Sequence, residues 1–142
     1  MSTACTAVLC LALLVGCTGS SGTGPGPSDV FGSWKLIDLQ GFNGKAHTTP
    51  DAAFTLSFSP TDIGVGRPGC ISTNLNVGVG ILHIGKNWRG RLLTGCPQLG
   101  EQQGRFLFKE VLSGTTRWEI HDGQLTLNHD NAAAVFQHAG AN

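Results

Sequence analysis

Apolar and polar residues alternate with a period of two along much of the chain after residue 30. In the clearest run, Phe54, Leu56 and Phe58 share one face, while Thr55 and Ser57 share the other. Successive side chains of a β-strand point to opposite faces, so this period predicts a half-buried strand. Similar short runs, separated by turn-forming residues, predict further strands at 31–39, 63–66, 75–79, 81–84, 88–94, 117–120, 125–127 and 132–136.

One segment, 98–112, has a helical period instead. The residues that recur at this spacing are Leu99, Gln103, Phe106 and Glu110, with Leu107 and Val111 alongside. Pro97 stands just before the segment and Gly114 just after it, which are typical start and stop signals. Asp122-Gly123 between two apolar alternations predicts a hairpin turn. The whole pattern predicts a mostly β (α+β) domain: a small curled antiparallel sheet or barrel-like domain with one packed helix.

The first sixteen residues differ from the rest of the chain. They contain no charged side chain, and 7–16 reads AVLCLALLVG, an apolar run of ten. About 20 apolar residues are needed to span a bilayer, whereas the apolar region of a signal peptide has roughly 7–15. Residues 1–16 are therefore predicted to be a signal peptide. The alternative is a buried strand or helix of the domain.

Leu14-Val15-Gly16-Cys17 resembles the bacterial lipoprotein cleavage motif, in which a small residue precedes a modified cysteine. The resemblance implies that Cys17 is lipidated, that the chain is cut before it, and that the protein is anchored on the exported side of a cell membrane or envelope. A plain secreted protein cut nearby is the alternative. The stretch 17–29, rich in Gly, Ser, Thr and Pro, is predicted to be a flexible tether that reaches on the order of 20 Å. The domain is then 30–138.

The five cysteines divide into two sets. Cys5 and Cys10 lie in the predicted signal peptide and Cys17 is the predicted lipid site, which leaves Cys70 and Cys96. An even pair in an exported domain predicts a disulfide. Closing a loop of about 26 residues stabilises a fold by roughly 3.5 kcal/mol in the chain-entropy model. A zinc site and a catalytic cysteine remain as alternatives, although further zinc ligands at short spacing are missing.

Length and charge narrow the class of protein. The chain has 142 residues, with nine basic and nine acidic side chains and a formal net charge of zero. This length suits one domain, and the charge balance argues against electrostatic capture of nucleic acid. No cofactor is predicted. The expected partners are the membrane, through the lipid on Cys17, and an unidentified protein of the envelope.

No catalytic or metal-binding constellation emerges from the sequence. Three histidines, His121, His129 and His138, could meet across the hairpin and bind a metal, but exposed turn histidines are the favoured interpretation. The carboxylates that could form an acid–base pair are Glu101, Glu110, Glu119 and Asp122. The protein is therefore predicted not to be an enzyme.

A short basic stretch surrounds one tryptophan. Lys86, Arg89 and Arg91 flank Trp88 and could meet an anionic head group, a polyanion or an acidic protein. The favoured interpretation is a solvated strand with Trp88 turned into the core. The other two tryptophans are also predicted to lie in the core, because both stand in strand-like runs: Trp34 and Trp118.

Several short motifs, in order, resemble the META/HslJ-type domain over about 31–136. They are FGSW at 31–34, GRPGC at 66–70, TGCP at 94–97 before the helix, and GQLTL at 123–127. Ile71 departs from the family, which usually has Asn there, and the chain has no Tyr. The resemblance implies a small, mostly β envelope domain, often on bacterial lipoproteins, sometimes linked to stress or antibiotic tolerance, and without agreed catalytic residues.

Two classes of function are expected from these observations. The first is a lipid-anchored, non-catalytic envelope protein that binds a partner. The alternative is an inhibitor of a hydrolase such as lysozyme, or a carrier of a small apolar ligand. Loops at 42–50 and 64–72 are the candidate contact regions for an inhibitor. An enzyme is the least favoured class.

Overall fold

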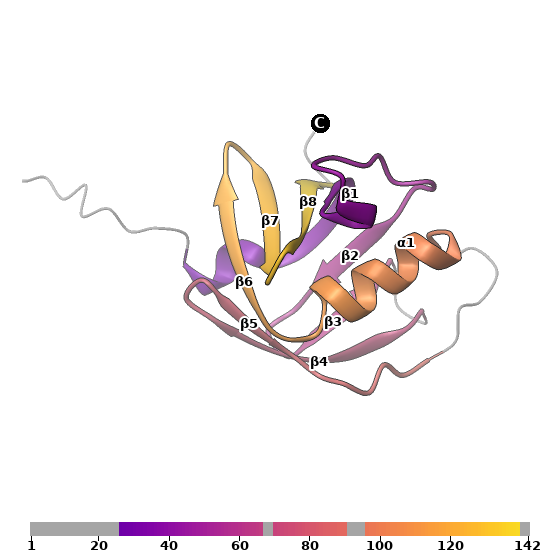
Figure 1. Ribbon diagram of the computed structural model, residues 1–142. Helices are drawn as coiled ribbons and strands as arrows, with labels where there is room; N and C mark the ends of the chain where they lie inside the picture. The colour runs from indigo at the N-terminus through magenta and orange to yellow at the C-terminus, as the bar shows by residue number, and fades with distance from the viewer. Residues whose placement is uncertain (1–25, 67–69, 91–95, 140–142) are drawn as a thin grey trace, which may run out of the picture.

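The computed structural model describes residues 26–66, 70–90 and 96–139 (Figure 1). Eight antiparallel strands form a closed barrel, in which each strand pairs with its neighbours in sequence and the last pairs with the first. The strands are β1 (Gly32–Gln40), β2 (Thr55–Phe58), β3 (Asp62–Val65), β4 (Ser72–Gly78), β5 (Ile81–Ile84), β6 (Gly114–His121), β7 (Gln124–His129) and β8 (Ala132–His138). The predicted mostly β, barrel-like domain with one packed helix is confirmed.

The helical elements are short. They are the 3-10 turns η1 (Pro27–Val30) and η2 (Phe42–Gly44), and α1 (Glu101–Arg105), which continues as the π-helical segment η3 (Phe106–Val111). The helix thus begins three residues later than its predicted start at Gln98. In the part of the chain that the structure describes, each helix falls short of the length and apolar character needed to cross a membrane.

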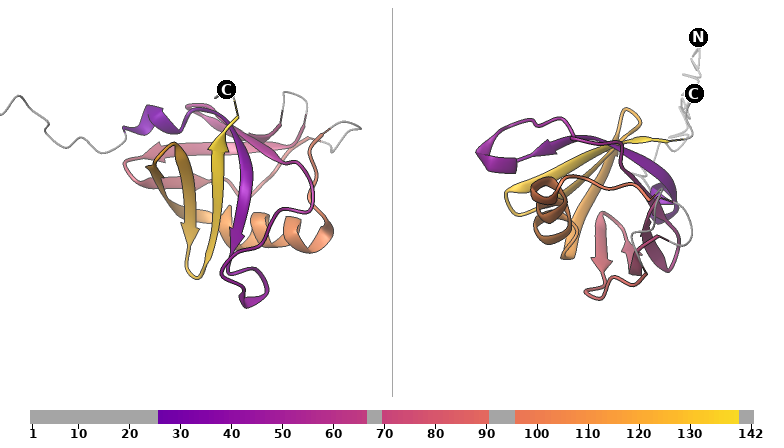
Figure 2. Two further views of the ribbon diagram at one scale, coloured as in Figure 1. Left: turned by 90° about the horizontal axis from the view of Figure 1, so that it is seen from above. Right: turned by 90° about the vertical axis from the view of Figure 1, so that its right-hand side faces the viewer.

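The end of the helix is wider than a regular α-helix. The Leu112 amide donates to the carbonyl oxygen of Leu107 at 2.8 Å, a bond that spans five residues instead of four. Leu107, Val111 and Leu112 are all buried. The wide turn therefore lets three apolar side chains face the barrel core together. Seen end-on, the helix lies among the strands (Figure 2, right).

The barrel interior is filled with apolar side chains. The largest fully buried ones are Phe54, Phe136, Leu39, Leu56, Ile63, Leu82, Leu107, Leu112, Leu125, Leu127, Val30 and Val65. An eight-stranded barrel is just wide enough for side chains to fill it. Trp34 and Trp118 are 2% and 4% exposed, which confirms that both lie in the core. Their indole N–H groups donate to the carbonyl oxygens of Val30 and Gly78.

The barrel has two unlike ends. Adjacent strands run in opposite directions, so successive connections alternate between the ends. The short turns β2–β3, β4–β5 and β6–β7 share one end, the turn end, with the start of β1. The long connections 41–54 and 85–113 and the β3–β4 connection share the other, the loop end. The β6–β7 turn contains the predicted Asp122-Gly123 pair, with φ of 52° and 76°, as expected for this hairpin.

The chain enters the barrel at the turn end through η1. Residues 27–29, predicted to be tether, instead form this turn with Val30, which is buried. The Asp29 carboxylate accepts a hydrogen bond from the Gly26 amide at 2.7 Å, and the Trp34 indole binds the Val30 carbonyl. In the structure, three residues of the predicted tether thus form a turn that packs with the start of the barrel.

Two predicted strands differ from the structure. The predicted strand 88–94 is not a strand in its described part: Arg89 makes one isolated bridge with Ser72, and Gly90 has a φ of 105° that breaks extended backbone. Residues 91–94 lie outside the described residues. In the 75–79 run, β4 ends at Gly78, and Val79 and Gly80 form the turn, because Gly80 adopts a left-handed φ of 70°.

Candidate functional site

The connection that leaves β1 projects from the barrel at the loop end (Figure 2). Its first part, 41–50, is called the β1–β2 loop below and corresponds to the predicted contact region 42–50. Residues 43–47 at its tip are exposed, whereas Phe42, Thr48 and Pro50 are half-buried. Exposed side chains on a loop with fixed ends are suited to contact another molecule.

The backbone of the β1–β2 loop is folded tightly. Gly41, Asn43 and Gly44 adopt φ of 87°, 53° and 73°, all in the left-handed region. The Gly41 amide donates to the carbonyl oxygen of Lys45 at 2.8 Å. The Lys45 amide donates to the carbonyl oxygen of Phe42 at 3.0 Å. A Cβ at Gly41 would collide with the carbonyl oxygen of Asn131, so only glycine fits the close approach of the β7–β8 turn.

Asp38 holds one side of the loop. A β-bulge between Leu36 and Asp38 shifts the alternation of β1 by one residue. Leu39 therefore returns to the interior, and the Asp38 carboxylate lies under the loop. The carboxylate accepts hydrogen bonds from Nδ1 of His47 at 2.7 Å, from the Thr48 amide at 3.0 Å, and from the Gln40 side chain at 3.2 Å.

These contacts shift the acidity of Asp38. Partial burial by itself raises the pKa of the carboxyl, but hydrogen bonds from His47, Gln40 and the Thr48 amide, with the nearby His47 charge, outweigh it and hold the pKa below its ordinary value. A carboxyl whose pKa is lower in the folded state contributes stability above its unfolded pKa of about 3.9. That contribution is lost as the pH falls through the folded-state pKa.

We expect Asp38→Asn to be less stable than the wild type at pH 6, and the difference to shrink as the pH falls below about 4. The reason is that the unfolded carboxyl is protonated first and the folded carboxyl only at its lower pKa, so the stabilisation that the ionised form provides declines over this range. Urea unfolding of both proteins between pH 3 and 6 measures this. Asp130→Asn, an exposed carboxylate of the β7–β8 turn, is the control. A difference independent of pH would contradict the expectation.

Gln103 holds the other side of the loop. Its side-chain oxygen accepts a hydrogen bond from the Asp51 amide at 2.8 Å, and its nitrogen donates to the Thr49 carbonyl oxygen at 3.1 Å. The Asp51 carboxylate accepts in turn from the Gly100 amide at 2.9 Å, just before α1. Gln103 is a buried polar side chain, so these bonds satisfy groups that would otherwise be costly to bury. The loop is thus fastened to the helix.

We expect Gln103→Leu to lower the free energy of unfolding by about 2 kcal/mol and to speed hydrogen exchange at the Asp51 amide. In this variant the Thr49 carbonyl and the Asp51 amide lose their side-chain partner, while the volume of the side chain at position 103 stays similar. Chemical denaturation and amide exchange measure the two effects. Gln102→Leu, at the exposed neighbouring position, is the matched control. Unchanged exchange at Asp51 would show that Gln103 does not hold the loop.

A groove of about 310 Å³ separates the loop from the helix. Phe42 and Phe106 meet edge to face there, with ring centroids 5.4 Å apart. Arg105 and Lys109 lie at its rim, and Arg105 also pairs with Glu101 at 3.1 Å. Half-buried aromatic rings beside cationic side chains can bind both apolar and acidic groups of a partner.

A second groove, of about 550 Å³, lies on the opposite side of the loop. Lys45 and His47 line it on the loop side, and Asp130 and Asn131 of the β7–β8 turn line the other wall. Charged and amide side chains thus stand on both of its walls. The β1–β2 loop is therefore a ridge between this groove and the aromatic one.

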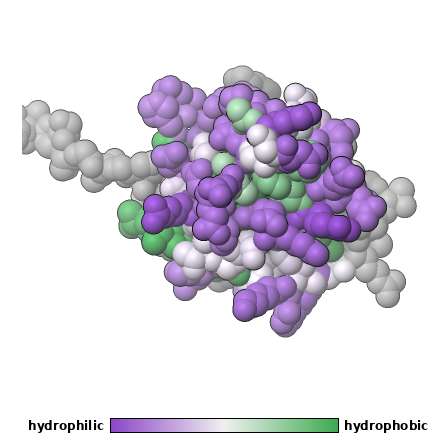
Figure 3. Space-filling model, viewed as in Figure 1, coloured by the Kyte–Doolittle hydropathy of each residue, from purple (hydrophilic) through white to green (hydrophobic). Residues whose placement is uncertain are grey.

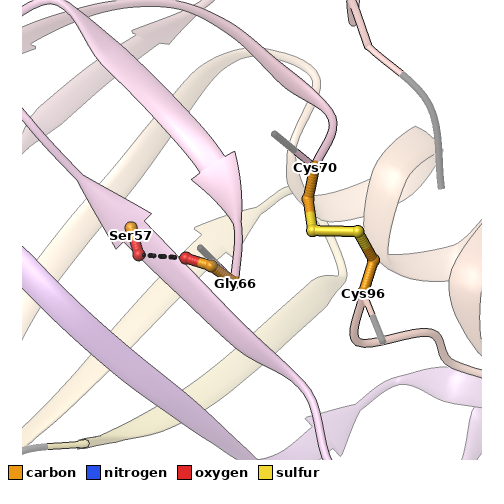
Figure 4. The surroundings of a disulfide bond; sticks show 4 residues. All are labelled: Ser57, Gly66, Cys70 and Cys96. Carbon is orange, nitrogen blue, oxygen red and sulfur yellow. Dashed lines mark hydrogen bonds between the residues drawn. A yellow bond between two sulfur atoms is a disulfide. The ribbon is translucent and has the colours of Figure 1, made fainter. Parts of the chain in front are cut away.

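The predicted disulfide is present at the loop end. Cys70 and Cys96 are joined with an S–S distance of 2.04 Å and a Cα–Cα distance of 5.9 Å (Figure 4). The bond ties the β3–β4 connection to the segment before α1. Beside it, the Ser57 hydroxyl donates to the Gly66 carbonyl oxygen at 2.6 Å (Figure 4). Neither thiol is left for the zinc or catalytic alternatives.

The second predicted contact region, 64–72, is mostly not a free loop. Gly64 pairs with Ser72 in the β3–β4 ladder, and Cys70 is buried. Residues 67–69 lie outside the described residues, as do Arg91 and the predicted lipid site Cys17 with the whole predicted signal peptide. Lipidation of Cys17 therefore stays a prediction.

The structure separates the histidines that could have formed a metal site. His121 and His129 lie at opposite ends of the β6–β7 ladder, because β6 pairs His121 with Gln124 at one end and Arg117 with Asn128 near the other. His138 packs edge-on against the Trp34 ring, with centroids 5.0 Å apart. Among residues 26–66, 70–90 and 96–139, no group of three metal-binding side chains comes together.

The four singled-out carboxylates fall into two separate groups. Glu101 and Glu110 belong to the helical segment, whereas Glu119 and Asp122 lie near the turn end. In the basic stretch, Trp88 is half-buried and its ring meets that of Phe108 at 4.9 Å, which confirms that it turns toward the core.

Sequence reasoning did not single out Asp38, Asp51 or Gln103 as residues that hold a site. The bonds of Gln103 reach 52 and 54 positions along the chain, a distance over which a local pattern carries no signal. One signal was available: Gln103 is polar at a position where the helical period predicts a buried face. A buried amide must find partners.

Comparison with known proteins finds a similar fold but gives no information about activity. No family model matches this chain, and no curated protein matches it. Its fold is similar to an NMR structure of a protein from Burkholderia xenovorans, with 18% identity, a TM-score of 0.51, and coverage of 78% of this chain and 83% of that one. At this level of identity the similarity concerns the fold alone.

Proposed function

We propose that this protein is a lipid-anchored, non-catalytic protein of a bacterial envelope that presents the β1–β2 loop to a protein partner. The observation that carries the proposal is that the chain entry and the candidate site lie at opposite ends of the barrel. The chain enters at the turn end, and the β1–β2 loop, its two grooves and the disulfide lie at the loop end. An anchor at Cys17 would hold the turn end near the membrane and leave the loop end facing away from it.

Three further features support a binding role. The loop tip is exposed, while its two sides are fastened by the bonds to Asp38 and Gln103. A loop that is already ordered loses little conformational entropy when it binds. The META/HslJ-type resemblance implies a small, mostly β domain on a bacterial lipoprotein, which agrees with the observed fold.

Intact mass of the full chain, produced in a bacterial host and extracted from its membranes, tests the anchor. We expect a mature chain that begins at Cys17 and carries lipid, with Cys70 and Cys96 alkylated only after reduction. Cys17→Ser is the control, which should lose the lipid and the membrane fraction but keep the disulfide. An unmodified mature chain that begins elsewhere would overturn the proposal.

The loop geometry favours one specific partner class as a second candidate, a hydrolase such as lysozyme that the loop would inhibit. An exposed ridge between two grooves can enter a substrate cleft. Purified protein should then slow lysozyme, and Lys45→Ala at the tip should weaken inhibition by about tenfold, as expected for a central contact residue. Thr61→Ala at the turn end should not. Unchanged lysozyme activity would exclude this candidate.

The apolar-carrier alternative is not proposed. A carrier needs an empty apolar cavity, whereas the largest buried side chains of the described residues fill the barrel centre.

A further inference from the structure

We propose that the β4–β5 turn, through Val79 and Ile81, contacts the lipid surface to which the chain is anchored. This inference rests on the anchoring proposed above, and it names a second membrane contact besides the lipid. The turn end would then face the membrane and touch it through these two apolar side chains.

The first observation is the exposure of these two side chains. Val79 is 78% exposed and Ile81 39%, and they are the exposed large apolar side chains among the described residues. Turn positions are usually polar or glycine, so a valine at the tip of a two-residue turn is unusual. Figure 3 shows an apolar patch on the side where Figure 1 places the β4–β5 turn.

The patch continues into a groove. A hollow of about 560 Å³ lies between the β4–β5 turn and the β6–β7 hairpin, with Val79 and Gly80 on one side and Trp118 and Ile120 among the residues that line it. Trp118 also binds the turn directly: its indole donates to the Gly78 carbonyl at 3.0 Å and its amide to that of Gly80 at 2.9 Å. The turn is therefore fixed to the barrel, and Val79 cannot fold back into the core without breaking these bonds.

The second observation is the length of chain between the predicted lipid and the domain. Gly26 lies nine residues after Cys17 and directly precedes η1. Nine residues reach at most about 30 Å when fully extended, and roughly 16 Å as a flexible coil. The domain itself has a diameter on the order of 35 Å. The turn end, where η1 and the β4–β5 turn both lie (Figures 1 and 2), is therefore held close to the bilayer.

The charges at this end favour an apolar contact over an electrostatic one. The acidic side chains of the described residues there are Asp29, Asp62, Glu119 and Asp122, which outnumber the basic ones, Lys35 of β1 and Arg117 of β6. An acidic surface is repelled by anionic lipids. The attraction is then the burial of Val79 and Ile81 in the interfacial region, which does not need lipid charge.

Tryptophan fluorescence in vesicles tests the contact. The full chain, extracted with its lipid, is reconstituted in phosphatidylcholine vesicles that contain brominated acyl chains, which quench nearby indoles. Trp34 and Trp118 lie toward the turn end, whereas Trp88 lies at the loop end. We expect the bromines to quench the tryptophan fluorescence strongly. The quenching should persist in Trp88→Phe, because the remaining indoles are those toward the turn end. Val79→Asn combined with Ile81→Thr should lower the ratio of docked to undocked molecules by at least about tenfold.

The control is Ala46→Asn, an exposed position on the β1–β2 loop, which should leave quenching unchanged. Equal quenching of the wild type and the double variant, with lipid on Cys17 verified by mass, would overturn the contact and leave the anchor intact. Absence of lipid on Cys17 would overturn the anchor, and the contact with it. Quenching that rises with the phosphatidylglycerol content of the vesicles and is the same in the wild type and the double variant would show an electrostatic contact. That result would also overturn the inference.

Discussion

Replacing Cys70 and Cys96 by serine is expected to lower the free energy of unfolding by about 3.5 kcal/mol. The disulfide closes 26 positions of chain, so it removes many conformations from the unfolded state. For a domain of this size, the loss corresponds to a fall in melting temperature of roughly 15 °C. It is a large share of a total stability of about 5–15 kcal/mol. Thermal and denaturant unfolding of the purified variant measure both quantities.

Reduction of the wild type should reproduce the effect of the double substitution. Cys17→Ser, which leaves the disulfide in place, is the control and should melt like the wild type. Equal melting temperatures with and without reductant would show that the bond does not stabilise the fold.

The second large effect is expected from Leu107→Ala, at about 3 kcal/mol of lost stability. Leu107 is fully buried on the face of the helix that packs into the barrel, and removing its side chain leaves a cavity there. Alanine is a good helix former, so the loss comes from packing and not from helix propensity. The midpoint of urea unfolding, compared with the wild type at an unchanged slope, gives the difference.

Lys109→Ala, two positions along on the exposed face, is the matched control and should change stability by less than about 0.5 kcal/mol. If Leu107→Ala were as mild as this control, the helix would not be part of the barrel core.

The strands were predictable where alternation is local and complete. Phe54, Leu56 and Phe58 have a period of two and are all buried, as the pattern requires. The Asp122-Gly123 turn was predictable because few other residue pairs accept two positive φ angles. The β1 bulge was not, because the shift at Asp38 depends on pairing with β8, almost 100 residues later.

Val79 shows how a correct period can still misplace a residue. It continues the alternation of Leu75 and Val77, so the pattern assigns it to a strand face. The left-handed φ of Gly80 ends the strand one residue earlier and turns Val79 into solvent. Whether the residue before a glycine lies in the strand or in the turn is decided by the register with β5, which the sequence of β4 does not contain.

The sequence by itself determined the mostly β class, the helix, most strands and the pairing of Cys70 with Cys96, because each depends on residue type and short spacing. The tertiary structure alone decided that the sheet closes, that a carboxylate and a buried amide fasten the β1–β2 loop, and that this loop and Val79 lie at opposite ends. These features depend on contacts between residues far apart in the chain, such as Gln103 with Thr49 and Asp51. Such contacts form only when closure of the barrel brings those segments together.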